Sequence, residues 1–147
     1  MMDEELLSPA WWRFVAEART AVLTTLGRDG RAAPVPICHA VLQGAIYSPL
    51  DEKPKRSDDP RSLARVRNLL ADPRAALLVH RWDEDWSRLA FVRLDVEGGL
   101  VEPGQDGHEA AVVVLRAKYP QYVGHRLERR PLLRFVPIRA TAWGTPD

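Results

Sequence analysis

Cysteine, lysine and long apolar segments are all scarce in this sequence. Cys38 is the only cysteine, so an internal disulfide is impossible and a reducing compartment is expected. No apolar run approaches the ~20 residues that span a bilayer. The acidic start MMDEELLSPA lacks the basic and apolar regions of a signal peptide. Together these absences predict a cytoplasmic protein that does not enter a membrane.

The charges nearly cancel. Lysine and arginine number 21, aspartate and glutamate number 20, and the net charge is +1. Because a nucleic-acid-binding surface needs a basic surplus, the composition argues against nucleic acid as a partner. The chain has 147 residues, of which 46% are hydrophobic, enough for one domain with a real core. We therefore expect a single domain over residues 1–147, with a helical N-terminal segment at 1–19.

Hydrophobic periodicity and turn residues predict about six short strands and three helices. Strands are expected over 21–27, 32–43, 45–48, 74–80, 89–102 and, as one or two strands, 132–144. Helices are expected over 9–19, 61–71 and 110–119, the last with a capping box at Asp106 and Glu109. Tight turns make neighbouring strands antiparallel. The pattern predicts a mainly β protein with peripheral helices, arranged as a small barrel.

Two of the predicted strands contain residues that disturb a regular ladder. Pro34 and Pro36 cannot donate ladder hydrogen bonds, so the strand over 32–43 is expected at a sheet edge, bulged, or turned toward a ligand. Gly98 and Gly99 interrupt the strand over 89–102, where we expect a bend or a bulge.

The lysines form the most unusual cluster. Only three of the 21 basic residues are lysine, and Lys53 and Lys55 flank Pro54, just after a predicted strand and before Arg56. One interpretation is a solvated surface loop. The other is a phosphate clamp, in which each ammonium acts as a compact point charge. The residues alone leave both interpretations open.

Other polar residues predict neither a metal site nor a catalytic side chain. The loop over 82–88 has two tryptophans around three carboxylates, which are usually solvated in such loops, although tryptophan and arginine could line a flat aromatic pocket. The four histidines lack metal-binding spacing, and Cys38 and His39 would point to opposite faces of a strand. Any reaction would therefore belong to a bound cofactor.

Several segments together resemble the split-barrel, flavin-binding superfamily of pyridoxamine 5′-phosphate oxidases. They are TAVLTTLGRDGRAAPVPICHAV, AIYSPLDEKPKR, RNLLADPRAALLV, DEDWSRLAFVRLDVEG and AAVVVLRAKYPQY, which cover most of the chain between Ala21 and Trp143. More narrowly, the chain is similar to the branch that uses the deazaflavin coenzyme F420. The resemblance implies an antiparallel split β-barrel that forms a homodimer, with cofactor sites at the interface.

The resemblance also implies which residues bind the cofactor. The phosphate would lie on the lysine-containing segment beside Ser48, the ring against the proline-containing strand, and further contacts would come from the partner chain. The implied cofactor-binding residues are Pro36, Ile37, Ser48, Lys53, Lys55, Arg56, Trp86, Arg88 and Trp143.

The implied activity is a coenzyme F420-dependent oxidoreductase that transfers hydride from the reduced cofactor to a small conjugated or aromatic substrate. Three alternatives stay open. The chain could be an FMN-dependent enzyme of the same fold, or a non-catalytic binder of flavin, haem or another tetrapyrrole. In the last alternative the groove is empty and the chain is an interaction protein.

Overall fold

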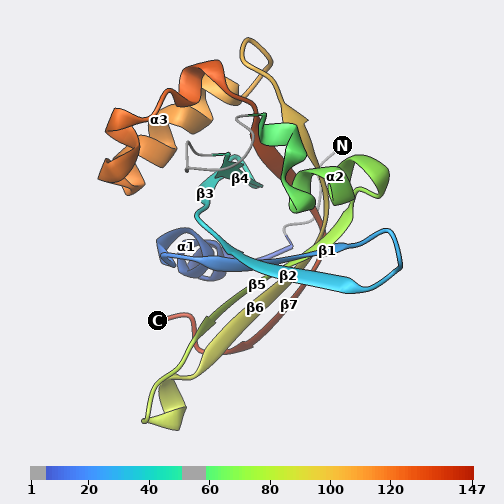
Figure 1. Ribbon diagram of the computed structural model, residues 1–147. Helices are drawn as coiled ribbons and strands as arrows, with labels where there is room; N and C mark the ends of the chain where they lie inside the picture. The colour runs from blue at the N-terminus through green and yellow to red at the C-terminus, as the bar shows by residue number, and fades with distance from the viewer. Residues whose placement is uncertain (1–5, 51–58) are drawn as a thin grey trace, which may run out of the picture.

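Seven antiparallel strands form one sheet (Figure 1). The structure, a computed structural model, describes residues 6–50 and 59–147. Its strands are β1 Ala21–Leu26, β2 Ala32–Ile37, β3 Ala40–Leu42, β4 Ala45–Pro49, β5 Arg74–Arg81, β6 Ala90–Val101 and β7 Leu132–Gly144. They lie in the order β2-β1-β5-β6-β7-β4-β3, and every pairing is antiparallel.

The sheet is curled because its two edges are consecutive in the chain. β2 and β3 are the outermost strands, yet only Cys38 and His39 separate them. Six strand spacings of a flat sheet would place these edges ~29 Å apart. The three peptide steps from Ile37 to Ala40 reach at most ~11 Å. The sheet therefore closes toward a barrel, which is split where the two edge strands meet without pairing.

Three α-helices lie around the barrel: α1 Pro9–Glu17, α2 Ala64–Ala71 and α3 His108–Lys118. Short 3-10 turns occupy Pro60–Ser62, Trp86–Arg88, Pro120–Gly124 and Leu127–Arg129. In Figure 1, α2 and α3 lie at the end of the molecule that contains β3 and β4, and the β5–β6 hairpin projects from the other end. The mainly β architecture with peripheral helices is confirmed.

Alternating positions of the strands fill the barrel. The largest contributors include Leu23, Leu77, Val92, Leu94 and Phe135, each at most 1% exposed. A second apolar cluster lies under α3. In it, three residues of the helix pack against side chains of β3, β4 and β7. Its members include Ala111, Val112, Leu115, Ala40, Tyr47 and Leu132.

Several local predictions are confirmed. Helix α1 begins after Ser8, whose Oγ accepts a hydrogen bond of 3.2 Å from the backbone N–H of Trp11. Val15 of this helix is 1% exposed. Strand β2 lies at a sheet edge, as Pro34 and Pro36 predict, because an edge strand does not need their missing N–H groups.

Two predicted elements are divided in the structure. The strand expected over 32–43 stops at Ile37, and β3 resumes at Ala40 on the opposite edge of the sheet. The helix expected over 61–71 becomes a 3-10 turn followed by α2, because Leu63 between them has extended backbone, with ψ at 139°. In contrast, the residues over 132–144 form one strand, β7.

The capping box predicted for the third helix is wrong. Gly107 precedes α3 with φ at 90°, and no side chain caps the helix there, so Asp106 does not play that role. A Cβ on Gly107 would lie 2.5 Å from the hydroxyl oxygen of Tyr47. The entry to α3 is therefore set by a positive φ and a close approach to Tyr47, which local spacing does not reveal.

Of the bend or bulge predicted at Gly98 and Gly99, the bulge is wrong. The register shift between β6 and β7 lies at Asp95 and Val96 instead. Gly98 has a packing role, because a Cβ there would lie 2.7 Å from Cδ1 of the buried Phe135. Gly99 has no heavy atom within 4 Å of the same added carbon.

The two neighbouring glycines allow a matched test of this packing. We expect Gly98→Ala to lower the free energy of unfolding by about 1–3 kcal/mol, as overpacked cores do. Gly99→Ala is expected to change it by less than about 1 kcal/mol, because the methyl group enters open space. Urea unfolding of both variants measures the difference. Equal stability of the two variants would contradict the packing role of Gly98.

Candidate functional site

Three of the predicted cofactor-binding residues meet where the barrel is split. Pro36 and Ile37 end β2, Ser48 lies near the end of β4, and all three line a cavity of about 110 Å³. Pro36 is exposed, whereas Ile37 and Ser48 are 5% and 1% exposed. We call this space the seam cavity. Its volume suits a phosphate-sized group and is too small for a tricyclic ring.

Five further residues complete the seam cavity, and the sequence did not predict them. They are Thr20, Cys38, Pro49, Arg65 and Tyr122. They come from the segment before β1, the β2–β3 connection, β4, α2 and the 3-10 turn after α3. The lining supplies hydroxyl groups and one guanidinium, and none of its described residues is acidic. This chemistry favours an anionic ligand.

Ser48 contributes to the cavity by positioning the backbone. Its Oγ donates a hydrogen bond of 2.7 Å to the carbonyl oxygen of Cys38. The single hydroxyl hydrogen is therefore already used, and the bond fastens β4 to the connection between the two edge strands. Arg65 is thus the stronger candidate for direct contact with an anion.

Tyr119 fastens the same connection from the other side. Its hydroxyl oxygen accepts a hydrogen bond of 3.1 Å from the backbone N–H of His39 and lies 2.8 Å from the carbonyl oxygen of Arg19, to which it donates. The Nε2 of His39 lies 2.7 Å from the carbonyl oxygen of Val15 in α1. These bonds hold α1, the β2–β3 connection and the end of α3 together.

Burial and positive charge perturb two titratable groups beside the cavity. Burial, followed by the charge of Lys118, lowers the pKa of His39 to about 4, so its imidazole is neutral near pH 7. Burial, followed by the charge of Arg19, lowers the pKa of Lys118 to about 8, and Cys38 acts in the opposite direction. Basic side chains from α1 and α3 therefore converge on the seam.

The lysine-containing segment lies outside the described residues. Lys53, Lys55 and Arg56 belong to 51–58, so their role in phosphate binding stays a prediction. The sequence leads from the cavity into this segment, because Pro49 lines the cavity and Leu50 is the last residue described before it.

Trp86 and Arg88 belong to the 3-10 turn between β5 and β6, and Trp143 pairs with Phe91 near the start of β6. The β5–β6 hairpin projects from the end of the molecule opposite to α2 and α3 (Figure 1). Trp86 is 70% exposed at the tip of the β5–β6 hairpin, and Trp143 is 54% exposed near the end of β7. The ring of Trp143 stacks on Phe91 at a centroid distance of 6.2 Å. The structure thus separates the predicted site into two groups, which a single chain does not bring together.

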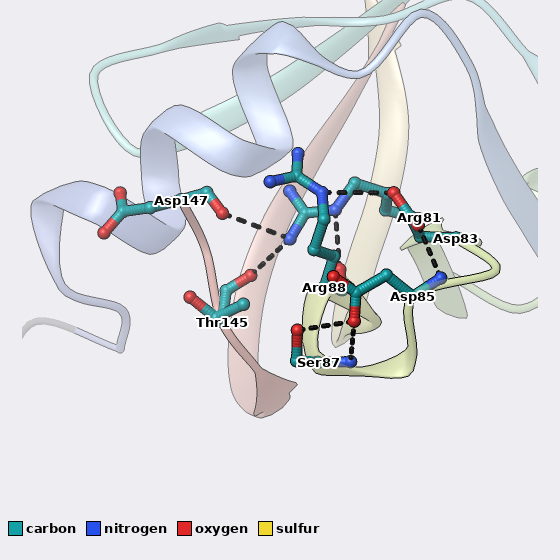
Figure 2. A network of polar contacts seen from close by, with 7 residues as sticks. All are labelled: Arg81, Asp83, Asp85, Ser87, Arg88, Thr145 and Asp147. Carbon is teal, nitrogen blue, oxygen red and sulfur yellow. Dashed lines mark hydrogen bonds and ion pairs between the residues drawn. The ribbon is translucent and has the colours of Figure 1, made fainter.

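Charged residues at the hairpin tip form a network of hydrogen bonds and ion pairs (Figure 2). Arg81 donates hydrogen bonds of 2.8 Å to the carbonyl oxygens of Arg88 and Thr145. The Nε of Arg88 lies 3.1 Å from Oδ2 of Asp83, and Asp85 accepts two hydrogen bonds from Ser87. The carboxylates of this loop therefore take part in local structure. Within 6–50 and 59–147, no three potential metal ligands cluster.

The outer face of the sheet carries a larger open groove of about 630 Å³. Its lining is mostly apolar, with three charged residues, and comprises Thr24, Leu26, Arg74, Ala75, Ala76, Asp95, Val96, Ile138 and Arg139. Thr24 pairs with Pro34 of β2, two residues from Pro36. Pro36, which lines the seam cavity, therefore lies ~7 Å along β2 from the residue that pairs with Thr24 of the groove. Unlike the cavity, the groove has room for a flat ring.

The curled sheet and its seam define the split-barrel class of flavin-binding folds. A sequence profile described as Pyridoxamine 5′-phosphate oxidase matches residues 7–145. The chain therefore belongs to the pyridoxamine 5′-phosphate oxidase family. A search of the curated proteins gave no match.

Solved structures share the fold at low sequence identity. The conserved hypothetical protein Rv2991 from Mycobacterium tuberculosis is 22% identical, with a TM-score of 0.75 over 98% of this chain and 90% of that one. HutZ, the haem storage protein from Vibrio cholerae, is 14% identical, with a TM-score of 0.71 over 95% of each chain. An FAD-binding protein from Mesorhizobium loti is 18% identical, with a TM-score of 0.61 over 88% and 87% of the chains.

Among the described residues, no helix combines the length and apolar character that a transmembrane segment requires.

The buried histidine predicts how stability depends on pH. The pKa of His39 is about 4 in the folded chain and 6.5 when unperturbed, so the unfolded state binds this proton first as pH falls. We expect this group to remove up to about 3 kcal/mol of stability between about pH 6.5 and about pH 4, and nothing at higher pH. Urea unfolding across this range measures the loss.

His39→Gln isolates the contribution of this group. Glutamine can still donate to the carbonyl oxygen of Val15, but it does not titrate. We expect the variant to be less stable near pH 7.5 and to lose less stability than wild type on going to pH ~4.5. An identical loss in both proteins would show that His39 does not carry the pH dependence.

Proposed function

We propose that the chain is a coenzyme F420-dependent oxidoreductase that transfers hydride from the reduced cofactor to a small conjugated or aromatic substrate. The seam cavity carries this proposal. It offers phosphate-sized space, the guanidinium of Arg65 and no described acidic neighbour, and it lies where Pro36, Ile37 and Ser48 were predicted to meet a cofactor. Membership of the pyridoxamine 5′-phosphate oxidase family supports a flavin-type cofactor.

The phosphate and the ring of the cofactor would bind at two different places. A phosphate fits the seam cavity, whereas the ring belongs on the outer face beside the exposed edge of β2. Pro34 and Pro36 lack N–H groups, which keeps this edge from pairing with another strand and leaves it open to a ligand. The prolines also offer flat apolar surface for a ring.

The chain then supplies binding and orientation, and the cofactor supplies the reaction. A reduced deazaflavin provides two electrons and a proton as hydride. Arg65 would hold the phosphate, helped by Lys53, Lys55 and Arg56. Ser48 would hold β4 to the β2–β3 connection by its bond to Cys38. We assign no catalytic side chain, because hydride transfer needs none.

FMN is the alternative cofactor, since it offers the same phosphate and a flat ring of similar size. The FAD-binding neighbour favours a flavin, and the haem storage protein HutZ favours a third possibility, a non-catalytic binder of haem or another tetrapyrrole. Titration with coenzyme F420, FMN and haem, followed by tryptophan quenching, separates the three. Tighter binding of F420 than of FMN supports the proposal. Tighter binding of FMN or of haem would favour that cofactor and contradict the proposal.

Arg65 gives a direct test of the phosphate position. We expect Arg65→Gln to weaken FMN binding about 10- to 100-fold, the loss of one charge-assisted hydrogen bond. Riboflavin, which lacks the phosphate, should bind wild type and variant equally. Arg67→Gln is the matched control, because Arg67 is exposed on the same helix and does not line the cavity. Equal losses for FMN and riboflavin would contradict the assignment.

We further propose that the protein works as a homodimer in the cytoplasm, with sites at the interface. Trp86, Arg88 and Trp143 do not line the seam cavity, so in this proposal a second chain would supply them. The outer sheet face has exposed apolar side chains suited to such an interface: Leu78, Val136, Ile138 and Trp143 are 37%, 43%, 56% and 54% exposed.

Sedimentation analysis tests this assembly. We expect a dimer for wild type and a monomer for Ile138→Asp, because a carboxylate buried at an apolar interface is strongly unfavourable. Val123→Asp is the control, since Val123 is 72% exposed on the turn after α3. A wild-type monomer, or a dimer unaffected by Ile138→Asp, would contradict this interface.

A further inference from the structure

The amine of Lys118 is held in a defined position at the end of α3. Its Nζ donates a hydrogen bond of 2.8 Å to the carbonyl oxygen of His39 and lies 5.1 Å from the centroid of the Tyr119 ring. The side chain is partly buried. Most surface lysines sample many rotamers, whereas this one is fixed by a carbonyl and an aromatic ring.

Arg19 reaches the same ring from the end of α1. Its Cζ lies 4.7 Å from the Tyr119 centroid, and one of its terminal N–H groups donates a hydrogen bond of 3.0 Å to the carbonyl oxygen of Lys118. The guanidinium of Arg19 and the amine of Lys118 therefore both lie close to the Tyr119 ring. In the described part of the chain, neither cation forms an ion pair with a carboxylate.

Burial and the positive charge of Arg19 favour the neutral amine, whereas the carbonyl oxygen of His39 and the ring of Tyr119 favour the charged form. The titratable and charged groups that face Lys118 are Arg19 after α1, Cys38 and His39 between β2 and β3, and Tyr119 on its own segment. With a pKa of about 8, roughly a quarter of the amine is neutral at pH 7.5, against about one part in a thousand for an ordinary lysine. The neutral amine can still donate a hydrogen bond to the carbonyl oxygen of His39, and its lone pair is nucleophilic.

We propose that Lys118 is a carbonyl-reactive lysine that forms an imine with small aldehydes bearing an anionic group. The preference for an anion follows from Arg19 beside the amine and from Arg65 in the adjoining cavity, which Cys38 also lines. The site differs from the flavin site, because it acts through a covalent bond to an amine.

Imine formation needs only the amine and the aldehyde, and it releases water. The amine nitrogen attacks the carbonyl carbon and forms a C–N bond, while the carbonyl oxygen takes up a proton. The resulting carbinolamine loses that oxygen as water, together with the remaining nitrogen proton, and a C=N bond forms. No atom is oxidised or reduced, and hydrolysis returns the free amine.

Glyoxylate with sodium cyanoborohydride tests the proposal on the wild-type chain. The reagent delivers hydride to the imine carbon and leaves a stable carboxymethyl group, which peptide mass spectrometry locates. The chain has only three lysines, so the sites are readily distinguished. We expect Lys118 to react at least about tenfold faster at pH 7.5 than Nα-acetyl-lysine added to the same sample. Its rate should level off above about pH 8, whereas that of acetyl-lysine keeps rising.

Acetaldehyde, which is neutral, tests the preference for an anion. We expect Lys118 to favour glyoxylate over acetaldehyde more strongly than acetyl-lysine does, and Arg19→Gln to reduce that preference. Arg13→Gln is the matched control, because Arg13 is exposed on α1. Labelling of Lys118 no faster than acetyl-lysine, or with the same pH profile, would overturn the proposal. Equal behaviour of the two arginine variants would overturn the anion preference.

Discussion

The two residues between β2 and β3 constrain the whole molecule. Cys38 and His39 join opposite edges of a seven-stranded sheet, so the sheet has to curl until those edges meet. Hydrogen bonds from Ser48 and to Tyr119 then fix the connection to β4 and to the end of α3. The barrel, its split and the cavity at that split all follow from this short connection. A longer linker would let the edges separate.

The same closure gathers positive charge at one place. Arg19, Arg65 and Lys118 follow or belong to α1, α2 and α3. Arg65 lines the seam cavity with Cys38, Lys118 donates to the carbonyl oxygen of His39, and Arg19 donates to that of Lys118. None of the described residues that line the seam cavity is acidic. A phosphate in the cavity and an anionic aldehyde at Lys118 would both draw on this positive charge. Burial of His39 in neutral form adds no further charge.

The opposite end of the sheet is held by hydrogen bonds and yet exposed. Arg81 connects the β5–β6 hairpin to the C-terminal residues, while Trp86 at its tip remains largely in solvent. An exposed aromatic residue on a hydrogen-bonded backbone offers a large apolar contact area to a partner. This arrangement gives a physical reason why two chains, and not one, would form a complete site.

Local sequence patterns determined much of the fold. Alternation and turns located the strands, and Pro34 and Pro36 placed β2 at an edge because they cannot donate ladder hydrogen bonds. Local patterns could not show that Gly98 makes room for Phe135, a residue on another strand. Nor could they bring Arg65 to the cavity, because its neighbours there come from four other segments. Residue types and spacing thus predicted most helices and strands, and the resemblance of the sequence to a known family named Pro36, Ile37 and Ser48, which line one cavity. Only tertiary closure decided which charges meet, because burial and electrostatic interactions depend on distance in space and not along the chain.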